Sequence, residues 1–166
     1  MRLSAFLVVF FSGFTFLHAQ QTITVDVGDP AVEVMGYDEA GKPVRLSDYS
    51  KEKYVLLNFT ATYCGPCWKT YQHMNDIQEN YKEDLKVISV HWDDLREQWS
   101  SIAQNKNIEF QCTSLWEVRD KKKILDTYQI DGWPYYFIID KNGMIVAKWF
   151  GARGGKLKRM IRKHLR

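Results

Sequence analysis

Two cysteines, Cys64 and Cys67, lie in the stretch NFTATYCGPCWKTY with only Gly65 and Pro66 between them. Two thiols at this spacing can form a reversible disulfide, and the thiolate of such a pair can attack a disulfide in another molecule. A disulfide that closes so short a loop adds little stability, because it removes little entropy from the unfolded chain. The pair therefore suits redox chemistry better than structural cross-linking.

The remaining cysteine, Cys112, follows the stretch IEFQ. A free cysteine in such a position is typically a small buried hydrophobe, so we expect it to be reduced and unpaired with Cys64 or Cys67. A second redox thiol or a partner-linking thiol is the alternative. A structural zinc site needs four ligands. Only Cys112, His73 and His91 could complete one around the pair, at no recognised spacing, so we expect no metal.

The first residues of the chain have the layout of a secretory signal peptide. Arg2 supplies positive charge, an apolar run reaches Leu17, and Ala19 offers a small residue at a cleavage site. The run is short for a membrane span, so an uncleaved anchor is the lesser alternative. We expect residues 1–19 to be removed and the domain at 20–166 to be secreted across the inner membrane, into the periplasm.

Charge and hydropathy narrow the classes of partner. The chain has 23 basic and 20 acidic residues, a formal net charge of +3 that falls by one when Arg2 is removed. So small an excess argues against a nucleic-acid partner. After residue 19 no apolar run is long enough to span a bilayer, so we expect no stable membrane insertion of the mature domain.

Buried strands and amphipathic helices alternate along the mature chain. The strands are predicted as a hairpin at 32–35 and 44–46, buried strands at 54–59 and 85–92, a weak strand near Phe110, and strands at 135–140 and 144–150 joined by Asn142-Gly143. The helices are predicted from Pro66 to Tyr81, at 95–103, at 119–128 and at 155–166. A strand–helix–strand unit implies a parallel centre, to which the closing hairpin adds antiparallel strands.

In this order of elements, Cys64 stands where a buried strand gives way to a helix. If Cys64 caps that helix, unpaired backbone N–H groups and the helix dipole face its sulfur. Both favour thiolate over thiol and so lower the pKa of Cys64. Cys67 lies one turn further and is more buried, which makes it the natural resolving thiol. Gly65 and Pro66 let the turn close and keep it stiff.

Three stretches together resemble a known family. They are VGDPAVEVMGYDEAGKPVRLSDYS, VLLNFTATYCGPCWK and GWPYYFIIDKNGMIVAKWFG, and they are similar to the extracytoplasmic thiol-disulfide oxidoreductases of the TlpA/ResA type over residues 27–166. The resemblance implies an α/β, thioredoxin-like fold with a central mixed sheet flanked by helices and an N-terminal β-hairpin extension.

The resemblance also implies an activity. It is the reduction of disulfides in secreted or periplasmic proteins by the Cys-Gly-Pro-Cys dithiol, with no cofactor and with a membrane electron donor that recharges the pair. A disulfide oxidase or isomerase is one alternative, and a non-catalytic binding or chaperone module on the same scaffold is another. A thiol peroxidase is disfavoured, because Ala61 stands where a peroxiredoxin has threonine.

Three further residues acquire expected roles through the resemblance. Pro134 is implied to be a cis proline packed against the disulfide, where the backbone of the preceding residue pairs with the substrate chain like an added strand. That preceding residue is Trp133, where smaller residues are usual; it could wall the groove, stack on substrate or simply fill the core. Tyr63 takes the place of the usual tryptophan before the first cysteine. Together with Trp133 and Pro134 it is assigned to substrate binding.

The chain departs from its relatives at positions that handle protons. Thioredoxin has a buried aspartate six residues before its first cysteine, where this chain has Asn58. The TlpA/ResA branch often has a glutamate and a proline where this chain has Thr70 and Gln72. These positions thus supply no carboxylate for the proton of Cys67.

Overall fold

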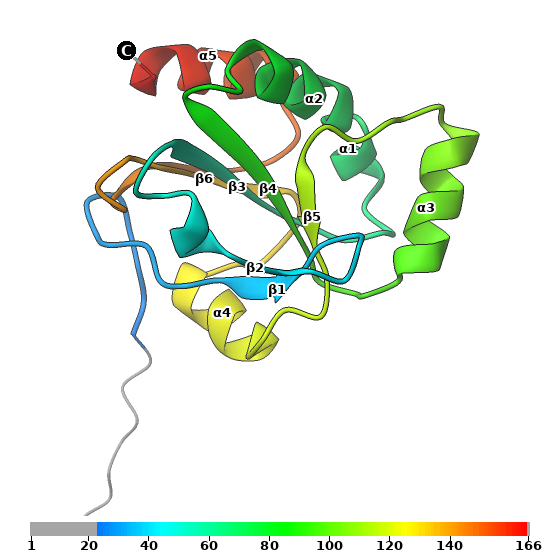
Figure 1. Ribbon diagram of the computed structural model, residues 1–166, viewed down its shortest axis with the longest axis horizontal. Helices are drawn as coiled ribbons and strands as arrows, with labels where there is room; N and C mark the ends of the chain where they lie inside the picture. Colours follow the sequence, from blue (N-terminus) through cyan, green and yellow to red (C-terminus); the bar gives the residue numbers. More distant parts are fainter. Residues whose placement is uncertain (1–22, 166) are drawn as a thin grey trace, which may run out of the picture.

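The computed structural model describes residues 23–165 (Figure 1), so the predicted signal peptide lies outside the described residues. The strands are β1 (Met35–Tyr37), β2 (Pro43–Arg45), β3 (Tyr54–Thr60), β4 (Leu85–His91), β5 (Thr113–Leu115), β6 (Tyr135–Ile139) and β7 (Ile145–Phe150). The helices are η1, a 3-10 turn (Leu46–Asp48), α1 (Gly65–Trp68), α2 (Tyr71–Asn80), α3 (Arg96–Asn105), α4 (Lys121–Tyr128) and α5 (Gly154–His164).

A five-stranded mixed sheet in the order β5-β4-β3-β6-β7 forms the centre of the domain. β3 pairs in parallel with β4, and β4 with β5, whereas β3–β6 and β6–β7 are antiparallel. The predicted combination of a parallel centre with an antiparallel closing hairpin is therefore confirmed. β1 and β2 form a separate two-stranded sheet, which is the predicted N-terminal hairpin extension.

Alternate residues of the central strands face two different cores. One core includes Leu56 and Val87 and lies under α2, α3 and α5. The other includes Leu57 and Ile88 and lies under α4 and the β1–β2 hairpin. Figure 1 shows α2 and α5 on one side of the sheet and α4 on the other. Because both faces are covered, the central strands are apolar almost throughout, as the run at 54–59 predicted.

The arms of the N-terminal hairpin are shifted from the predicted 32–35 and 44–46. The first arm extends to Tyr37, which exchanges two backbone hydrogen bonds of 2.9 Å with Trp116, just after β5. The hairpin is thus held against a segment far away in sequence, and this contact sets which residues pair.

The helix predicted from Pro66 to Tyr81 is divided into α1 and α2. At the break, Thr70 donates two hydrogen bonds to the carbonyl oxygen of Cys67, one from its side-chain hydroxyl at 2.8 Å and one from its backbone N–H at 3.0 Å. A threonine hydroxyl that bonds to the backbone competes with the helical ladder. The ladder resumes where Met74 N–H donates to the Thr70 carbonyl. The cysteine pair therefore occupies a short helix of its own.

The weak strand predicted near Phe110 is β5, which begins three residues later. Phe110 instead stacks on Trp99 of α3 with ring centroids 3.8 Å apart, and meets Tyr71 of α2 edge-on at 4.8 Å. Aromatic pairs of this kind stabilise packing beyond the area they bury. They fix the segment before β5 against two helices instead of in the sheet.

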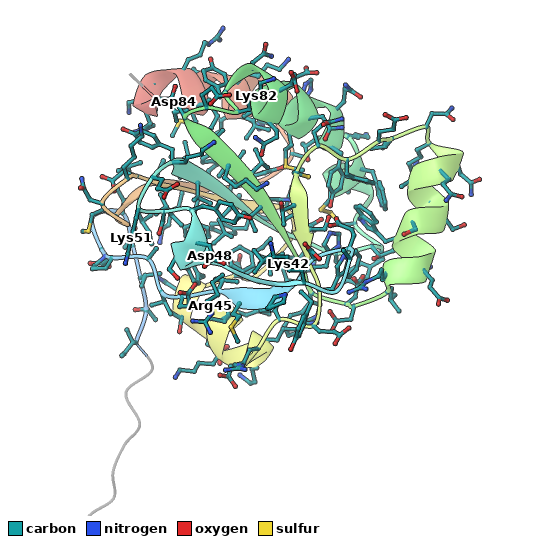
Figure 2. All side chains as sticks on the ribbon, in the orientation of Figure 1. Lys42, Arg45, Asp48, Lys51, Lys82 and Asp84 are labelled. Carbon is teal, nitrogen blue, oxygen red and sulfur yellow. A yellow bond between two sulfur atoms is a disulfide. The ribbon has the colours of Figure 1, made fainter. Side chains whose placement is uncertain are left out.

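The other predicted elements form within two residues of their expected ends. In the closing hairpin, Gly143 has a φ of 78°, the left-handed conformation that an Asn-Gly turn requires. Charged side chains such as those of Lys82 and Asp84 lie at the rim, outside both cores (Figure 2). No helix within residues 23–165 has the length and apolar character needed to cross a membrane.

Candidate active site

Cys64 and Cys67 lie at the junction between β3 and α1, as predicted, and are joined by a disulfide with an S–S distance of 2.04 Å. Cys64 is the N-cap of α1, and its Sγ accepts a hydrogen bond from the backbone N–H of Cys67 at 3.1 Å. Pro66 stands in the first turn, where a missing N–H leaves no helical bond unmade. The N-terminus of α1 therefore faces the Cys64 sulfur, an arrangement that stabilises a thiolate.

The two sulfur-bearing residues differ slightly in exposure. Cys64 is 6% exposed and Cys67 is 1% exposed, so the predicted order is confirmed. Both are nevertheless buried, because Trp133 packs against the small cluster that they form with Ala61. Access to the Cys64 sulfur thus depends on the aromatic side chains around it.

Trp133, which packs against the cysteine pair, contacts two other aromatic residues. The indole Nε1 of Trp133 donates to the hydroxyl of Tyr63 at 3.1 Å. The Trp133 ring also stacks on Trp92, with centroids 6.0 Å apart and an interplanar angle of 30°. Tyr63 is 68% exposed, whereas Trp133 is half-buried. Trp133 therefore walls the site and is not core filler alone.

Pro134 follows a cis peptide bond from Trp133, as the resemblance implied. Pro134 is buried, and its carbonyl oxygen accepts a hydrogen bond from Gly151 N–H at 2.9 Å. This bond ties the loop before β6 to the end of β7. The predicted site residues Tyr63, Trp133 and Pro134 thus lie in two loops that meet at the cysteine pair.

The sequence analysis missed two residues that hold the cysteine loop, Thr62 and Asp93. The carboxylate of Asp93 accepts from the Thr62 backbone N–H at 2.6 Å and from the Thr62 hydroxyl at 3.0 Å. The Thr62 carbonyl in turn accepts from Trp68 Nε1 at 2.9 Å. The sequence contained a signal for this contact: each residue is the second after one of two neighbouring parallel strands, whose carboxyl ends meet at one edge of a sheet.

Asn58 and Thr70, where the resemblance implied carboxylates, bear neutral side chains that are hydrogen-bonded to other neutral groups. Asn58 is buried and its Nδ2 donates to Ser89 Oγ at 3.3 Å. Thr70 is buried, and its hydroxyl accepts from the Tyr136 hydroxyl at 2.8 Å. Burial raises the pKa of Tyr136 to about 12, so this phenol stays protonated at neutral pH. Gln72 lies on the surface, where its amide bonds to Asp76.

Cys112 is buried and free, as predicted. Its Sγ lies 3.8 Å from Ser89 Oγ. Burial raises the pKa of the Cys112 thiol to about 11, which keeps it protonated and unreactive near neutral pH.

The two histidines considered as zinc ligands lie in packed surroundings. His91 is fully buried and stacks on Trp116 with centroids 3.8 Å apart. His73 is half-buried, and a Cβ added at Gly154 would overlap its ring, so the imidazole fills the space beside the first residue of α5. Within the described part of the chain, no group of three or more His, Cys, Asp or Glu residues is placed to hold a metal ion.

The AhpC/TSA family model matches residues 27–148. The chain belongs to the AhpC/TSA family. Within this family it is 30% identical over 128 residues to the thiol-disulfide oxidoreductase ResA of Bacillus cereus strain ZK / E33L, covering 76% of this chain and 71% of that protein.

Two further members of this group extend the likeness. The thioredoxin-like protein YneN of Bacillus subtilis strain 168 is 28% identical over 151 residues, covering 86% of this chain and 85% of YneN. The thioredoxin domain of a thiol-disulfide oxidoreductase from Bacteroides vulgatus superposes with a TM-score of 0.74 at 28% identity, covering 86% of this chain and all of that domain. The fold is thioredoxin-like, and this AhpC/TSA family member is a thiol-disulfide oxidoreductase.

Proposed function

We propose that this thiol-disulfide oxidoreductase acts outside the cytoplasm as a reductant of protein disulfides, with Cys64 as the attacking thiolate and Cys67 as the resolving thiol. The observation that carries the assignment is the hydrogen bond from Cys67 N–H to Cys64 Sγ at the start of α1. It directs the positive end of the helix at the sulfur of Cys64 and leaves Cys67 as the more buried member of the pair.

The reaction proceeds in two exchanges. The Cys64 thiolate attacks a substrate disulfide; a Cys64–substrate S–S bond forms, the substrate S–S bond breaks and one substrate thiolate leaves. Cys67 then loses its proton and attacks Cys64 Sγ, which forms the Cys64–Cys67 disulfide and releases the second substrate thiolate. Two electrons pass from the dithiol to the substrate, and each released thiolate takes up a proton.

The proton of Cys67 has no carboxylate acceptor at Asn58 or Thr70. The Thr70 hydroxyl instead donates its hydrogen bond to the Cys67 carbonyl oxygen. Water or the departing substrate thiolate must then take the Cys67 proton, so the second exchange is slow at neutral pH.

Substrate binding is assigned to the surface beside the disulfide. The backbone of Trp133 would pair with an extended substrate segment, with Pro134 fixing that loop. Tyr63 and Trp133, which are hydrogen-bonded to each other, offer aromatic surface beside the cysteine pair. The substrates are protein disulfides, and a membrane dithiol donor returns two electrons to the Cys64–Cys67 disulfide after each turnover.

The proposed direction follows from the surroundings of the cysteines. The intervening Gly65-Pro66 is that of thioredoxin, whose potential is about −270 mV. A strong oxidant needs a highly stabilised thiolate, and this site has no histidine between the cysteines. The exposed Lys69 is the nearest cation along the chain. These features favour a dithiol that gives up electrons readily.

Two measurements test the function and its direction. Insulin reduction should occur with the wild-type protein and fail with Cys64→Ala. Equal rates of insulin reduction with the two proteins would indicate a non-catalytic binding or chaperone module. Titration against glutathione and dithiothreitol should give a midpoint well below about −180 mV, the value of protein disulfide isomerase. A higher midpoint would instead indicate an oxidase or isomerase.

The extracytoplasmic location rests on the predicted signal peptide at 1–19. The mature protein is expected to begin at Gln20 and to contain the single domain at 20–166. Intact mass measurement of the protein from the periplasmic fraction tests this. A full-length chain recovered with the membranes would mean that the segment is kept as an anchor.

A further inference from the structure

We propose that Asp93 is a positioning residue that fixes the cysteine loop and, by its charge, disfavours the Cys64 thiolate, making the dithiol a stronger reductant. This inference rests on the proposed role of Cys64 as the attacking thiolate. It concerns a residue that lies 31 positions from its partner Thr62 in the sequence.

Asp93 clamps the loop through both carboxylate oxygens. Oδ2 accepts from Thr62 N–H at 2.6 Å and Oδ1 accepts from Thr62 Oγ1 at 3.0 Å. Trp68 Nε1 donates to the Thr62 carbonyl from the opposite side. All three polar groups of Thr62 are thus engaged, and Thr62 is only 2% exposed. The residue two positions before Cys64 has no freedom to move by itself.

The loop turns back immediately after this clamp. Cys64 N–H donates to the Ala61 carbonyl at 3.1 Å, which closes a four-residue turn over Thr62. Such a turn brings its end residues to within about 7 Å of each other. The Asp93 carboxylate is bonded to Thr62, which lies within this turn and two residues before Cys64.

The parallel pairing of the sheet brings Asp93 to this place. β3 and β4 are in register, with Thr60 opposite His91, and Trp92 N–H donates to the Thr60 carbonyl at 3.0 Å. The segments that follow β3 and β4 therefore leave the sheet side by side. Asp93 is the second residue after β4 and Thr62 the second after β3, so the clamp continues the register beyond the sheet.

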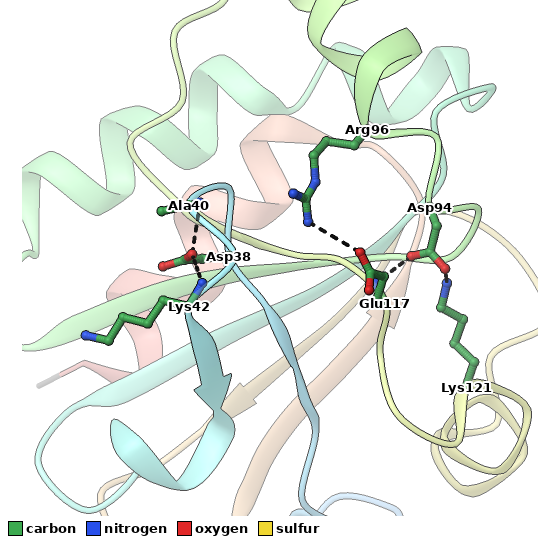
Figure 3. A network of polar contacts seen from close by, with 7 residues as sticks. All are labelled: Asp38, Ala40, Lys42, Asp94, Arg96, Glu117 and Lys121. Carbon is green, nitrogen blue, oxygen red and sulfur yellow. Dashed lines mark hydrogen bonds and ion pairs between the residues drawn. The ribbon is translucent and has the colours of Figure 1, made fainter.

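The negative charge of Asp93 is not neutralised by an ion pair among the described residues. Its neighbour Asp94 differs: one oxygen pairs with the Lys121 ammonium and the other accepts from Glu117 N–H at 2.7 Å (Figure 3). Asp93 is half-buried and receives only neutral donors. Asp93 therefore lies in a half-buried position beside the loop without a paired cation among the described residues.

Three other charged residues lie on neighbouring segments: Lys69, Asp131 and Lys121, whose ammonium pairs with Asp94 and donates to the Trp92 carbonyl at 2.8 Å. Lys69 follows α1 and is exposed, and Asp131 precedes the cis-proline loop and is also exposed. Solvent screens both more than it screens Asp93. A nearby like charge disfavours an ionised thiol. Asp93 thus opposes the stabilisation that the N-terminus of α1 gives to the thiolate, and a less stabilised thiolate makes the disulfide form relatively more favourable.

The Asp93→Asn variant removes the negative charge but can keep both hydrogen bonds to Thr62. The asparagine Oδ1 can accept from Thr62 N–H, and its Nδ2 can donate to the Thr62 hydroxyl, so the loop stays fixed. We expect the pKa of Cys64, read from thiolate absorbance of the reduced protein, to fall. The glutathione equilibrium should move about three- to tenfold toward the dithiol, where tenfold corresponds to about 30 mV. Asp93→Ala removes the clamp as well and should also lower the thermal midpoint.

The matched control is Asp84→Asn at the opposite end of β4. The strand's seven residues at ~3.3 Å each place Asp84 about 20 Å or more from Asp93, beyond the screening length at physiological salt. This variant removes the same charge and should leave the pKa of Cys64 and the glutathione equilibrium unchanged.

The outcomes distinguish this inference from the proposed function. A folded Asp93→Asn protein with wild-type Cys64 pKa and equilibrium would overturn the inference, and so would equal shifts in Asp93→Asn and Asp84→Asn. If instead the wild-type protein fails to reduce insulin, the proposed function fails, while the Cys64 pKa still decides the role of Asp93.

Discussion

The hydrogen bond from Trp133 Nε1 to the Tyr63 hydroxyl, 3.1 Å long, joins the cis-proline loop to the cysteine loop. Trp133 also packs against the cluster of Ala61, Cys64 and Cys67 and stacks on Trp92. Trp133, which is larger than the residues usual at this position, thus forms a wall of the site. We expect a protein substrate to contact this wall on its way to the Cys64 sulfur, and a small dithiol to need less space.

Trp133→Ala should slow insulin reduction by about three- to tenfold, because each aromatic contact with a substrate contributes roughly 1 kcal/mol. The rate of reduction of the protein by dithiothreitol should fall less, or rise as the sulfur becomes more accessible. Stopped-flow tryptophan fluorescence and an insulin turbidity assay give the two rates. The Trp133→Phe variant keeps an aromatic ring, so its rate of insulin reduction should lie between those of the wild type and Trp133→Ala. Equal losses with insulin and with dithiothreitol would rule out a role in substrate binding.

Cys67→Ala should accumulate mixed disulfides in cells, because the Cys64 thiolate can attack a substrate while no resolving thiol releases it. Cys64→Ala should trap far less, since Cys67 is almost completely covered. Non-reducing electrophoresis after acid quenching measures both, and the captured proteins identify the substrates. Equal trapping by the two variants, or by neither, would contradict the assignment of roles.

Local patterns were sufficient to predict the motif and its setting. The apolar run at 54–59 followed by Pro66 predicted a buried strand leading into a helix, and Asn142-Gly143 predicted the closing hairpin. These signals work because they depend on neighbouring residues. The break in the helix at Thr70 was missed, since a threonine that bonds its own backbone leaves the apolar periodicity almost unchanged.

Contacts between distant segments could not be read from the sequence. The clamp of Asp93 on Thr62 needs the register of two parallel strands, which only the folded sheet fixes. The same holds for His73. An exposed position on its helix was expected, but the ring is half-buried beside Gly154 of α5, a contact that depends on how α5 docks.

Cys112 should be almost inert toward iodoacetamide in the native protein. Burial raises its pKa to about 11 from 9.0, so at pH 8 the thiolate fraction falls about a hundredfold, before any effect of poor access. Mass spectrometry should find the native, oxidised protein unlabelled and the urea-unfolded protein labelled once, at Cys112. A peptide in which Cys112 is bonded to Cys64 or Cys67 would overturn its assignment as a free structural thiol.

His91 should make the fold sensitive to acid. Burial first, and the charge of Lys121 second, lower the pKa of His91 from 6.5 to about 3. Between these values the unfolded chain binds a proton that the folded chain does not, so the stability from this residue is fully present above pH 6.5 and is lost as pH falls toward 3. The slope is about 1.4 kcal/mol per pH unit in the free energy of unfolding.

His91→Phe keeps a ring against Trp116 and removes the titrating group. Neither ring nitrogen of His91 has a hydrogen-bond partner among the described residues, so the variant should stay within about 1.5 kcal/mol of wild type at pH 7. Below pH 6.5 its unfolding free energy should fall more slowly than that of wild type, and the gap should widen down to about pH 4. Urea unfolding followed by tryptophan fluorescence at several pH values measures it. Parallel profiles for the two proteins, or an NMR titration of His91 near pH 6.5 in the folded state, would show that His91 is not held neutral by burial.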